Sequence, residues 1–331
     1  MDRIIYADGG IGRVLCLTPA IRTLKNREPD DRIVVVTGWP DVFVNNRDVS
    51  KIYPFSHHYM WDDVVRHGIL YNPEPYQDYR YYTQQHHIIQ SFDYLINGID
   101  SSQPAPIINL TPQLVRFGIE LVEHIKKESG KKHVVAFQPF GATANFDGEI
   151  TDPSYRSLPF QTAIKIAEAA SDWGMMFNCC NIDLDHVNVW RRESSLTELF
   201  AIVAACDYVI SIDSLLGHVG AAFQKPGLHL LGSTYAENVG YPNLYRTVTR
   251  AGYPKAYQPN RIHGGVELNY DAMYYDEAEL ESLLDMVRNR DFFPTVKEEV
   301  KKISLDSSHE GVYLQSDEAQ QCLHLVDNSE T

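Results

Sequence analysis

Residues 207–234 read DYVISIDSLLGHVGAAFQKPGLHLLGST, and this stretch decides the predicted fold. Tyr208–Ile212 is a short β-branched run, which is typical of a buried strand. Gly217–Phe223 is small and apolar, as expected of a helix that packs closely on a sheet, and a Lys-Pro-Gly sequence ends it. Leu228–Leu231 is a second strand. The stretch therefore predicts a strand–helix–strand unit of a parallel α/β sheet.

Polar residues follow both strands of this unit. Asp213 and Ser214 come after the first strand, and Thr234 comes after the second. Ligands bind at the carboxyl ends of the strands in parallel α/β sheets, and a helix N-terminus at that edge suits phosphate. The residues therefore predict an anion site. The alternative is an ordinary unit in which Asp213 only caps the helix.

The composition limits the class of protein. A chain of 331 residues, 44% of them hydrophobic, predicts two globular domains of ordinary size. No apolar run is long enough for a membrane helix, and the N-terminus has no signal-peptide pattern. The five cysteines lack metal-ligand spacing, so we expect free thiols and a cytoplasmic location. The net charge of −15 argues against generic binding to nucleic acid or an anionic membrane.

The N-terminal residues predict a strand, a glycine-rich turn, a helix and a second strand. The strands are Arg3–Ala7 and Ile33–Thr37, and the helix is Val14–Asn26. In the turn, Gly10 and Gly12 allow the backbone to approach a ligand closely, and the helix N-terminus after it favours anions. The glycines lack the GxGxxG spacing of dinucleotide-binding proteins, and a plain strand-to-helix turn is the alternative.

Residues 41–105 are rich in tyrosine, histidine, tryptophan and aspartate. Aromatic rings stack on sugar rings or bases, and carboxylates bind hydroxyl groups; the alternative is loops whose aromatic side chains pack on the domain edge. Adjacent pairs such as His57-His58 lack the one-face spacing of a helical metal site, so no metal site is predicted. The candidate ligand-binding residues of this segment are Trp61, Asp62, Asp93, Tyr81 and Tyr82.

A polar connector at Glu128–Lys132 follows a predicted helix at Pro112–Lys127 and marks the expected domain boundary. We therefore expect one Rossmann-like domain at residues 1–130 and a second at residues 131–290. A helix at residues 291–304 is expected to pack back on the first domain. Residues 305–331 are expected to form an acidic, partly mobile tail.

Several motifs follow one another along the chain in a distinctive order. Residues 9–25 read GGIGRVLCLTPAIRTLK, and residues 195–213 read SLTELFAIVAACDYVISID. Over residues 1–40 and 134–235 the order resembles glycosyltransferase family 9, the heptosyltransferase-type enzymes of lipopolysaccharide core synthesis. The resemblance implies the α/β GT-B fold, in which two Rossmann-like, doubly wound domains face each other across a cleft, and it implies a nucleotide-sugar donor and no obligatory metal. The other matching positions are Pro139–Ala142, Arg156–Pro159, Asp213-Ser214, His218, Lys225-Pro226 and Gly232–Thr234.

The resemblance also implies roles for individual residues. The family usually carries an aspartate, its proposed catalytic base, directly after the N-terminal glycine turn, where this chain has Arg13. A guanidinium stays protonated and cannot act as a base, so Arg13 could instead contact donor phosphates or an anionic acceptor. Asp8 is the nearest substitute base, with Asp62, Asp63 and Asp93 as rivals. The implied donor-binding residues are Gly10, Gly12, Arg156, Asp183, Asp213, Ser214, Gly217, His218 and Thr234. The candidate acceptor-binding residues come from the aromatic segment instead, and they are Trp61, Asp62, Asp93, Tyr81 and Tyr82.

Two further positions bear on donor binding. Leu215 replaces a family glycine whose N–H contacts phosphate, so the resemblance does not predict this one phosphate contact here. Asp183 and Asp185 spell DxD, a metal–diphosphate motif of the other glycosyltransferase fold. Because the sequence follows a predicted strand of the second half, we favour a ribose-hydroxyl contact by Asp183, and a capped turn is the alternative.

The predicted function is that of a cytoplasmic, metal-independent, inverting glycosyltransferase. It would move a sugar from a nucleotide-diphosphate sugar to an acceptor hydroxyl of a glycan, with no permanently bound cofactor. One alternative is a DNA glycosyltransferase that acts on a hydroxymethylated base, with the flipped base stacked on the aromatic segment. A second alternative is a catalytically silent sugar-nucleotide-binding protein, which Arg13 in the base position would explain. The sequence leaves open the sugar, the nucleotide base and the oligomeric state.

Overall fold

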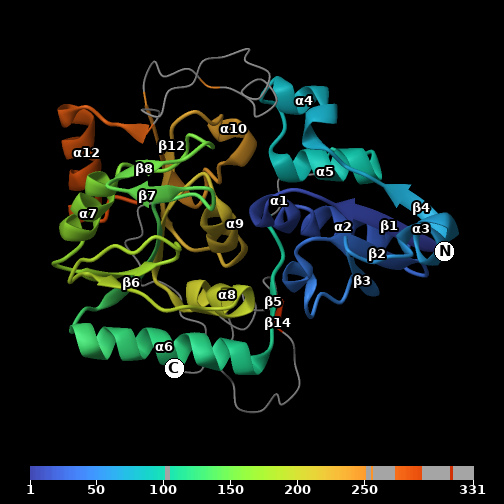
Figure 1. The fold of residues 1–331 in the computed structure, drawn as a ribbon, viewed down its shortest axis with the longest axis horizontal. Coiled ribbons are helices and arrows are strands. Elements are labelled where there is room, and N and C mark those ends of the chain that lie inside the picture. The colour runs from blue at the N-terminus through green and yellow to red at the C-terminus, as the bar shows by residue number, and fades with distance from the viewer. Residues whose placement is uncertain (101–104, 251–254, 256–272, 293–313, 316–331) are drawn as a thin grey trace, which may run out of the picture. The chain divides into compact units, whose positions relative to one another are not determined.

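The computed structural model describes residues 1–100, 105–250, 255, 273–292 and 314–315. The chain divides into two compact units, Met1–Pro112 with Asp306–Thr331, and Gln113–Leu305. Each unit contains a parallel sheet with helices packed against it (Figure 1). The predicted α/β class with two Rossmann-like units is confirmed.

The sheet of the first unit has the strand order β3-β2-β1-β4, and all neighbours are parallel. The register aligns Ala7 with Thr37 and Thr37 with Pro54, so the carboxyl ends of the strands lie at one edge. The chain order changes direction between β1 and β4, which makes a topological switch point at that edge. The strands are β1 (Asp2–Ala7), β2 (Arg32–Thr37), β3 (Lys51–Pro54) and β4 (Gly68–Tyr71).

The helix expected at residues 14–26 is two helices, α1 (Ile11–Leu15) and α2 (Thr18–Arg27). Pro19 lies in the first turn of α2, where its missing N–H is tolerated, and Leu17 closes a tighter turn on Val14 before it. Helix α2 packs against α5 (Ile88–Asn97). The shorter elements are η1 (Pro40–Phe43), α3 (Met60–Asp63), η2 (Val65–His67), η3 (Pro75–Gln77), α4 (Tyr79–Tyr82) and β5 (Asn109–Leu110), which pairs with β14 (Leu314–Gln315).

The sheet of the second unit has the order β10-β9-β6-β11-β12-β13, and every pair is parallel. This is the strand order of a doubly wound dinucleotide-binding sheet, with its switch point between β6 and β11. The strand–helix–strand prediction for residues 207–234 is confirmed by β11, α9 and β12. The strands are β6 (His133–Gln138), β9 (Gly174–Asn178), β10 (Val189–Trp190), β11 (Tyr208–Ile212), β12 (Gly227–Leu231) and β13 (Tyr245–Thr249).

Capping residues begin the helices of the second unit where the sequence indicates. Ser195 and Asp276 each form a capping box with a glutamate three residues on. The segment expected to be a polar loop after β6 contains a short hairpin, β7 (Asn145–Asp147) and β8 (Glu149–Thr151). The helices are α6 (Pro112–Ser129), α7 (Phe160–Ala169), α8 (Leu196–Ala205), α9 (Leu215–Ala222), α10 (Ala236–Val239) and α12 (Glu277–Arg288).

The division between the units falls at the start of α6, not after it at residues 130–131 where the boundary was expected. Helix α6 lies alongside α8 (Figure 1), and a Cβ on Gly118 would lie 2.2 Å from the carbonyl oxygen of Ala201. This close backbone approach makes α6 part of the second unit. The helix expected at residues 291–304 and the tail at 305–331 lie outside the described residues, apart from Asp291, Phe292 and β14.

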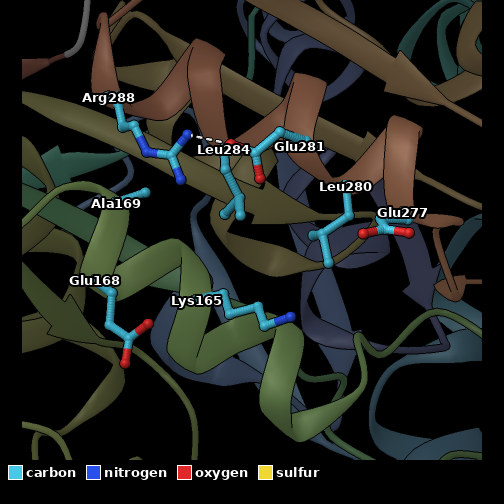
Figure 2. A pocket seen from close by; sticks show the side chains of 8 residues that line it. All are labelled: Lys165, Glu168, Ala169, Glu277, Leu280, Glu281, Leu284 and Arg288. Atoms are coloured by element: carbon cyan, nitrogen blue, oxygen red, sulfur yellow. Dashed lines mark hydrogen bonds and ion pairs between the residues drawn. The ribbon is translucent and has the colours of Figure 1, made fainter.

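Helices α7 and α12 pack side by side, and a shallow groove runs between them (Figure 2). Leu280 and Leu284 point into the gap from α12, while charged side chains such as Lys165 and Glu168 border it from α7 (Figure 2). Arg288 donates to Glu281 at 2.5 Å on the same helix. The groove contains none of the predicted site residues. Among the described residues no helix has both the length and the hydrophobicity to cross a membrane.

Candidate functional site

The switch point of the second unit brings together the ends of β6 and β11. Gln138, the last residue of β6, accepts a hydrogen bond on Oε1 from the backbone N–H of Leu216 at 2.8 Å. It therefore caps the N-terminus of α9. Ser214 occupies the N-cap position but makes no side-chain capping bond, so the amide of Gln138 takes the place of a capping hydroxyl.

Asp213 lies at the centre of this edge and is buried, with 8% of its surface exposed. Its Oδ2 accepts a hydrogen bond from Thr234 at 2.7 Å and lies 3.4 Å from a guanidinium nitrogen of Arg156. Burial raises the pKa of a carboxylate, but the charge of Arg156 and the Thr234 hydroxyl outweigh it, so the pKa of Asp213 lies below its ordinary value. Three residues predicted separately are thus brought into one charged cluster.

Asp152 positions the loop that carries Arg156, and it was not predicted. The carboxylate is 4% exposed and accepts hydrogen bonds from the hydroxyl groups of Thr143, Ser154 and Ser157 at 2.6–2.7 Å. The backbone N–H groups of Ser154 and Ser157 also donate to it. These bonds outweigh the effect of burial and lower its pKa. The sequence signal was an aspartate at the start of a Pro-Ser turn, which favours such local bonds.

Arg156 is half-exposed, yet one of its donors has no acceptor. Its side chain is 38% exposed, while the Nε atom is buried and without a hydrogen-bond partner among the described residues. Buried donors are normally paired, so this guanidinium is arranged to receive an additional acceptor.

Two buried histidines lie behind the cluster. His218 on α9 shares a hydrogen bond between Nδ1 and the Tyr241 hydroxyl at 2.7 Å. Burial lowers the pKa of both His218 and His229 to about 4, so both rings are neutral at pH 7. A Cβ on Gly217 would lie 3.3 Å from Nε2 of His229, and the Gly217 carbonyl accepts from Tyr245. Gly217 is therefore a buried packing position, which does not fit its predicted donor contact.

Asp183 forms its ion pair with a residue outside this cluster. Its side chain is 65% exposed and forms an ion pair with Arg191 at 2.9 Å. Among the described residues no three His, Cys, Asp or Glu side chains are grouped as metal ligands. The ribose contact of Asp183 stays a prediction.

The switch point of the first unit carries Asp8, the glycine turn and Arg13. The Asp8 carboxylate is exposed, and its hydrogen bond among the described residues comes from the neighbouring Gly9 N–H at 2.6 Å. Arg13 forms an ion pair with Glu74 at 2.5 Å, and Glu74 comes from the loop after β4, the strand beside β1. Glu74 was not predicted, because only strand pairing brings it to Arg13. The roles of Gly10 and Gly12 stay predictions, and space beside Gly10 is open.

The side chains predicted to form an aromatic surface are only partly exposed to solvent. Trp61 is 67% exposed, and Asp62 forms an exposed ion pair with Arg66 at 3.2 Å. Asp93 is 1% exposed and accepts from Asn97 one turn along α5 at 2.6 Å, which makes it an interior helix residue. Tyr81 is likewise buried, unlike its half-buried neighbour Tyr82. Asp93 and Tyr81 therefore do not fit the acceptor contacts predicted for them.

The cysteines of the described residues are free thiols, as predicted: Cys16, Cys179, Cys180 and Cys206. Burial raises the pKa of Cys180 and of Cys206 to about 12. A buried thiol with a raised pKa is a poor nucleophile, so these groups belong to the core and not to the site.

Comparison with known proteins gives one family match. Residues 185–262 match the family model of glycosyltransferase family 9 (heptosyltransferase), a segment that includes α8, β11, α9 and Asp213. No curated protein sequence matches the chain.

Solved structures with the same fold include a glycosyl transferase family 9 protein from Veillonella parvula DSM 2008, with TM-score 0.62, 13% identity, and coverage of 87% of this chain and 97% of that chain. The E. coli ADP-heptose lps heptosyltransferase II is similar with TM-score 0.55, 12% identity and coverage of 88% and 100%. A dodecameric iron-containing heptosyltransferase, TibC of E. coli H10407, solved with ADP-D-beta-D-heptose, has TM-score 0.59, 11% identity and coverage of 87% and 76%. At these identities the similarity shows the fold.

The match over residues 185–262 includes Asp213 and Thr234 of the charged cluster, while Arg156 precedes it, and the fold agrees with the motif order of the sequence. The chain resembles glycosyltransferase family 9 over residues 185–262, and its fold is the GT-B fold of the similar heptosyltransferase structures.

Proposed function

We propose that the protein moves a sugar from a nucleotide-diphosphate sugar to an acceptor hydroxyl with inversion at the anomeric carbon. The observation that carries the proposal is the cluster of Arg156, Asp213 and Thr234 beside the N-terminus of α9 at a switch point. The E. coli heptosyltransferase TibC was solved with an ADP-sugar, which supports a donor of the same class here.

Donor binding is proposed for the second unit. The Arg156 guanidinium is 38% exposed and its Nε has no acceptor among the described residues, so a diphosphate oxygen would accept from its N–H groups. The remaining N–H groups in the first turn of α9 favour the same negative charge. Because these groups meet the charge of the leaving diphosphate, transfer is expected to persist in the presence of EDTA.

Acceptor activation is proposed for Asp8 in the first unit. Asp8 is exposed at the end of β1, whereas the carboxylate of Glu74 is already paired with Arg13. Asp8 would take the proton of the acceptor hydroxyl while the acceptor oxygen forms a bond to the anomeric carbon. The bond from that carbon to the diphosphate oxygen would break, and its electron pair would leave with the nucleoside diphosphate.

The acceptor is proposed to be a glycan, and the reaction to take place in the cytoplasm. The net charge of −15 disfavours a DNA acceptor, because DNA affinity depends on neutralising phosphates with lysine and arginine. The free, unreactive thiols fit a reducing compartment.

The test is a panel of ADP-, UDP-, GDP- and CMP-sugars, measured by thermal shift and by donor hydrolysis. One nucleotide class is expected to raise the melting temperature, since a ligand at about 100 times its Kd adds about 2.7 kcal/mol of stability. Arg156→Ala should lose this shift, and Asp8→Asn should keep it but lose transfer. Absence of stabilisation and of hydrolysis with every donor would refute the proposal. Donor binding without transfer, unchanged in Asp8→Asn, would indicate a silent binding protein instead.

A further inference from the structure

We propose that Trp39 and Phe55 form an acceptor subsite that stacks on the ring of a sugar next to Asp8. The inference rests on the proposed function, because it names the residues that select the acceptor of that reaction. Trp39 lies outside the aromatic segment at residues 41–105, and Phe55 lies within it but was not among its candidate residues.

Trp39 is held by one hydrogen bond to the glycine turn and by a second to the end of β2. It follows β2, the strand beside β1, and its indole Nε1 donates to the carbonyl oxygen of Gly9 at 2.8 Å. Its backbone N–H donates to the Thr37 hydroxyl at 3.1 Å. The indole edge is thus fixed one residue from Asp8 in the chain. A ring anchored in this way loses little conformational entropy when a ligand stacks on it.

Phe55 is held at the same edge from the next strand. It follows β3 and stacks on Tyr6 of β1, with ring centroids 4.9 Å apart and planes at 27°. Its other neighbour is Gly38, where a Cβ would lie 3.4 Å from the Phe55 ring. Gly38, which lies between β2 and Trp39, therefore contacts Phe55. Both rings thus lie at the carboxyl ends of adjacent strands.

The two rings remain partly open to solvent despite these contacts. Trp39 and Phe55 are each 39% exposed, although both are anchored by neighbours within the unit. Anchored, exposed aromatic rings beside a carboxylate are the arrangement that binds sugars, since the apolar face of the sugar stacks on a ring and its hydroxyl groups bind the carboxylate. Trp61 differs, because it is 67% exposed on the four-residue helix α3.

A sugar ring fits this surface better than a nucleic-acid base does. Gly9, which accepts from the Trp39 indole, is flanked by the Asp8 carboxylate and by Arg13 with its partner Glu74, and these three groups together carry no net positive charge. A DNA substrate would bring phosphates to this edge, where an acidic chain of net charge −15 repels them. We therefore assign the subsite to a neutral pyranose.

The first test measures acceptor binding without any donor. Methyl α-D-mannopyranoside and methyl β-D-glucopyranoside serve as probes in saturation-transfer NMR with the full chain. At least one glycoside is expected to show saturation of its ring protons, lost in Trp39→Ala, weakened in Phe55→Ala and largely kept in Trp39→Phe. Tyr79→Ala removes a 76% exposed ring of the same unit that lies outside the proposed subsite, and it is the control, expected to behave as the parent protein.

The second test uses the donor that the nucleotide-sugar panel identifies. Trp39→Ala should raise the KM for the glycoside acceptor about tenfold, the size of a lost aromatic contact, and leave the donor KM and donor hydrolysis unchanged. Equal glycoside saturation in Trp39→Ala and the parent, or saturation only by 5-hydroxymethyl-2′-deoxycytidine, would overturn the subsite even if donor turnover is found. Loss of saturation in Trp39→Ala together with no donor binding would support the subsite and overturn the proposed function. Thermal melts of each variant distinguish lost contacts from lost folding.

Discussion

The carboxyl edges of the two sheets are built in opposite ways. In the second unit the polar side chains are buried and connected to one another, with Asp213 bonded to Thr234 and Asp152 bonded to three hydroxyl groups. In the first unit the groups at the edge are open to solvent, and the rings of Trp39 and Phe55 keep 39% of their surface exposed. A buried network fixes one geometry, which suits a ligand part that never changes, such as a diphosphate. An open aromatic edge suits ligands that differ between relatives.

The contrast between the two sheet edges predicts that the largest effect of a substitution is the loss of activity on replacing Arg156. Replacement by alanine removes the charge that faces the leaving diphosphate, so kcat/KM should fall about 100-fold or more, measured with the identified donor. Arg156→Lys should recover only part of the loss, because lysine cannot reproduce the forked donor geometry. A kcat/KM within threefold of the parent in Arg156→Ala would move the diphosphate site elsewhere.

The next effect is on stability at Asp152. Its replacement by alanine leaves buried hydroxyl and N–H groups without an acceptor, so the free energy of unfolding should fall by about 3 kcal/mol in urea titrations. Glu281→Ala removes an exposed ion pair with Arg288 and is the control, expected to leave stability nearly unchanged. Similar losses in both variants would mean that the Asp152 network contributes no special stability.

A third prediction concerns pH and the second unit. His218 and His229 are buried and neutral with pKa values of about 4, below the ordinary value of 6.5. The unfolded chain therefore binds protons first as the pH falls, and stability should decrease between pH 6.5 and 4, by a total on the order of 3 kcal/mol for each histidine. The lowered pKa values of Asp152 and Asp213 act only below their ordinary value of 3.8. Urea titrations at pH 7.5, 6 and 5 measure the slope, which His229→Leu should reduce; an unchanged slope in that variant would contradict the assignment.

The smallest effect is expected in the first unit, at Glu74. The Arg13–Glu74 pair is partly exposed on both sides, at 23% and 34%, so Glu74→Gln should change stability by less than about 1 kcal/mol. Donor affinity should stay the same and sugar transfer should fall a few-fold, because Arg13 packs against the glycine turn next to Asp8. A large loss of stability would show that the first unit depends on buried polar contacts as much as the second.

The second unit was more predictable from sequence than the first, and the reason is physical. Asp213 and Thr234 follow strands, so local pattern brought them to one edge, whereas Arg156 was named through the resemblance to a known family. Gln138, Glu74 and Trp39 act through side chains whose direction depends on strands distant in sequence, and no local pattern reveals such contacts. Asp93 could have been placed correctly, because the apolar positions Ile89, Phe92 and Ile96 put it on the buried side of α5. The composition of the segment suggested Asp93 as a ligand-binding residue, whereas the helical periodicity of α5 would have predicted that it is buried.

The loop around Asp152 has a consequence for how the protein changes over evolutionary time. Its contacts are local. The backbone N–H of Leu158 donates to the carbonyl of Pro139, and the Asp152 carboxylate accepts hydrogen bonds from residues between these two positions. A short ring of this kind costs little loop entropy to order. The hairpin of β7 and β8 projects from inside the ring, with residues 145–149 exposed. Insertions, deletions and substitutions in the hairpin should therefore accumulate without displacing Arg156. The hairpin sequence can diverge rapidly while the position of Arg156 is maintained.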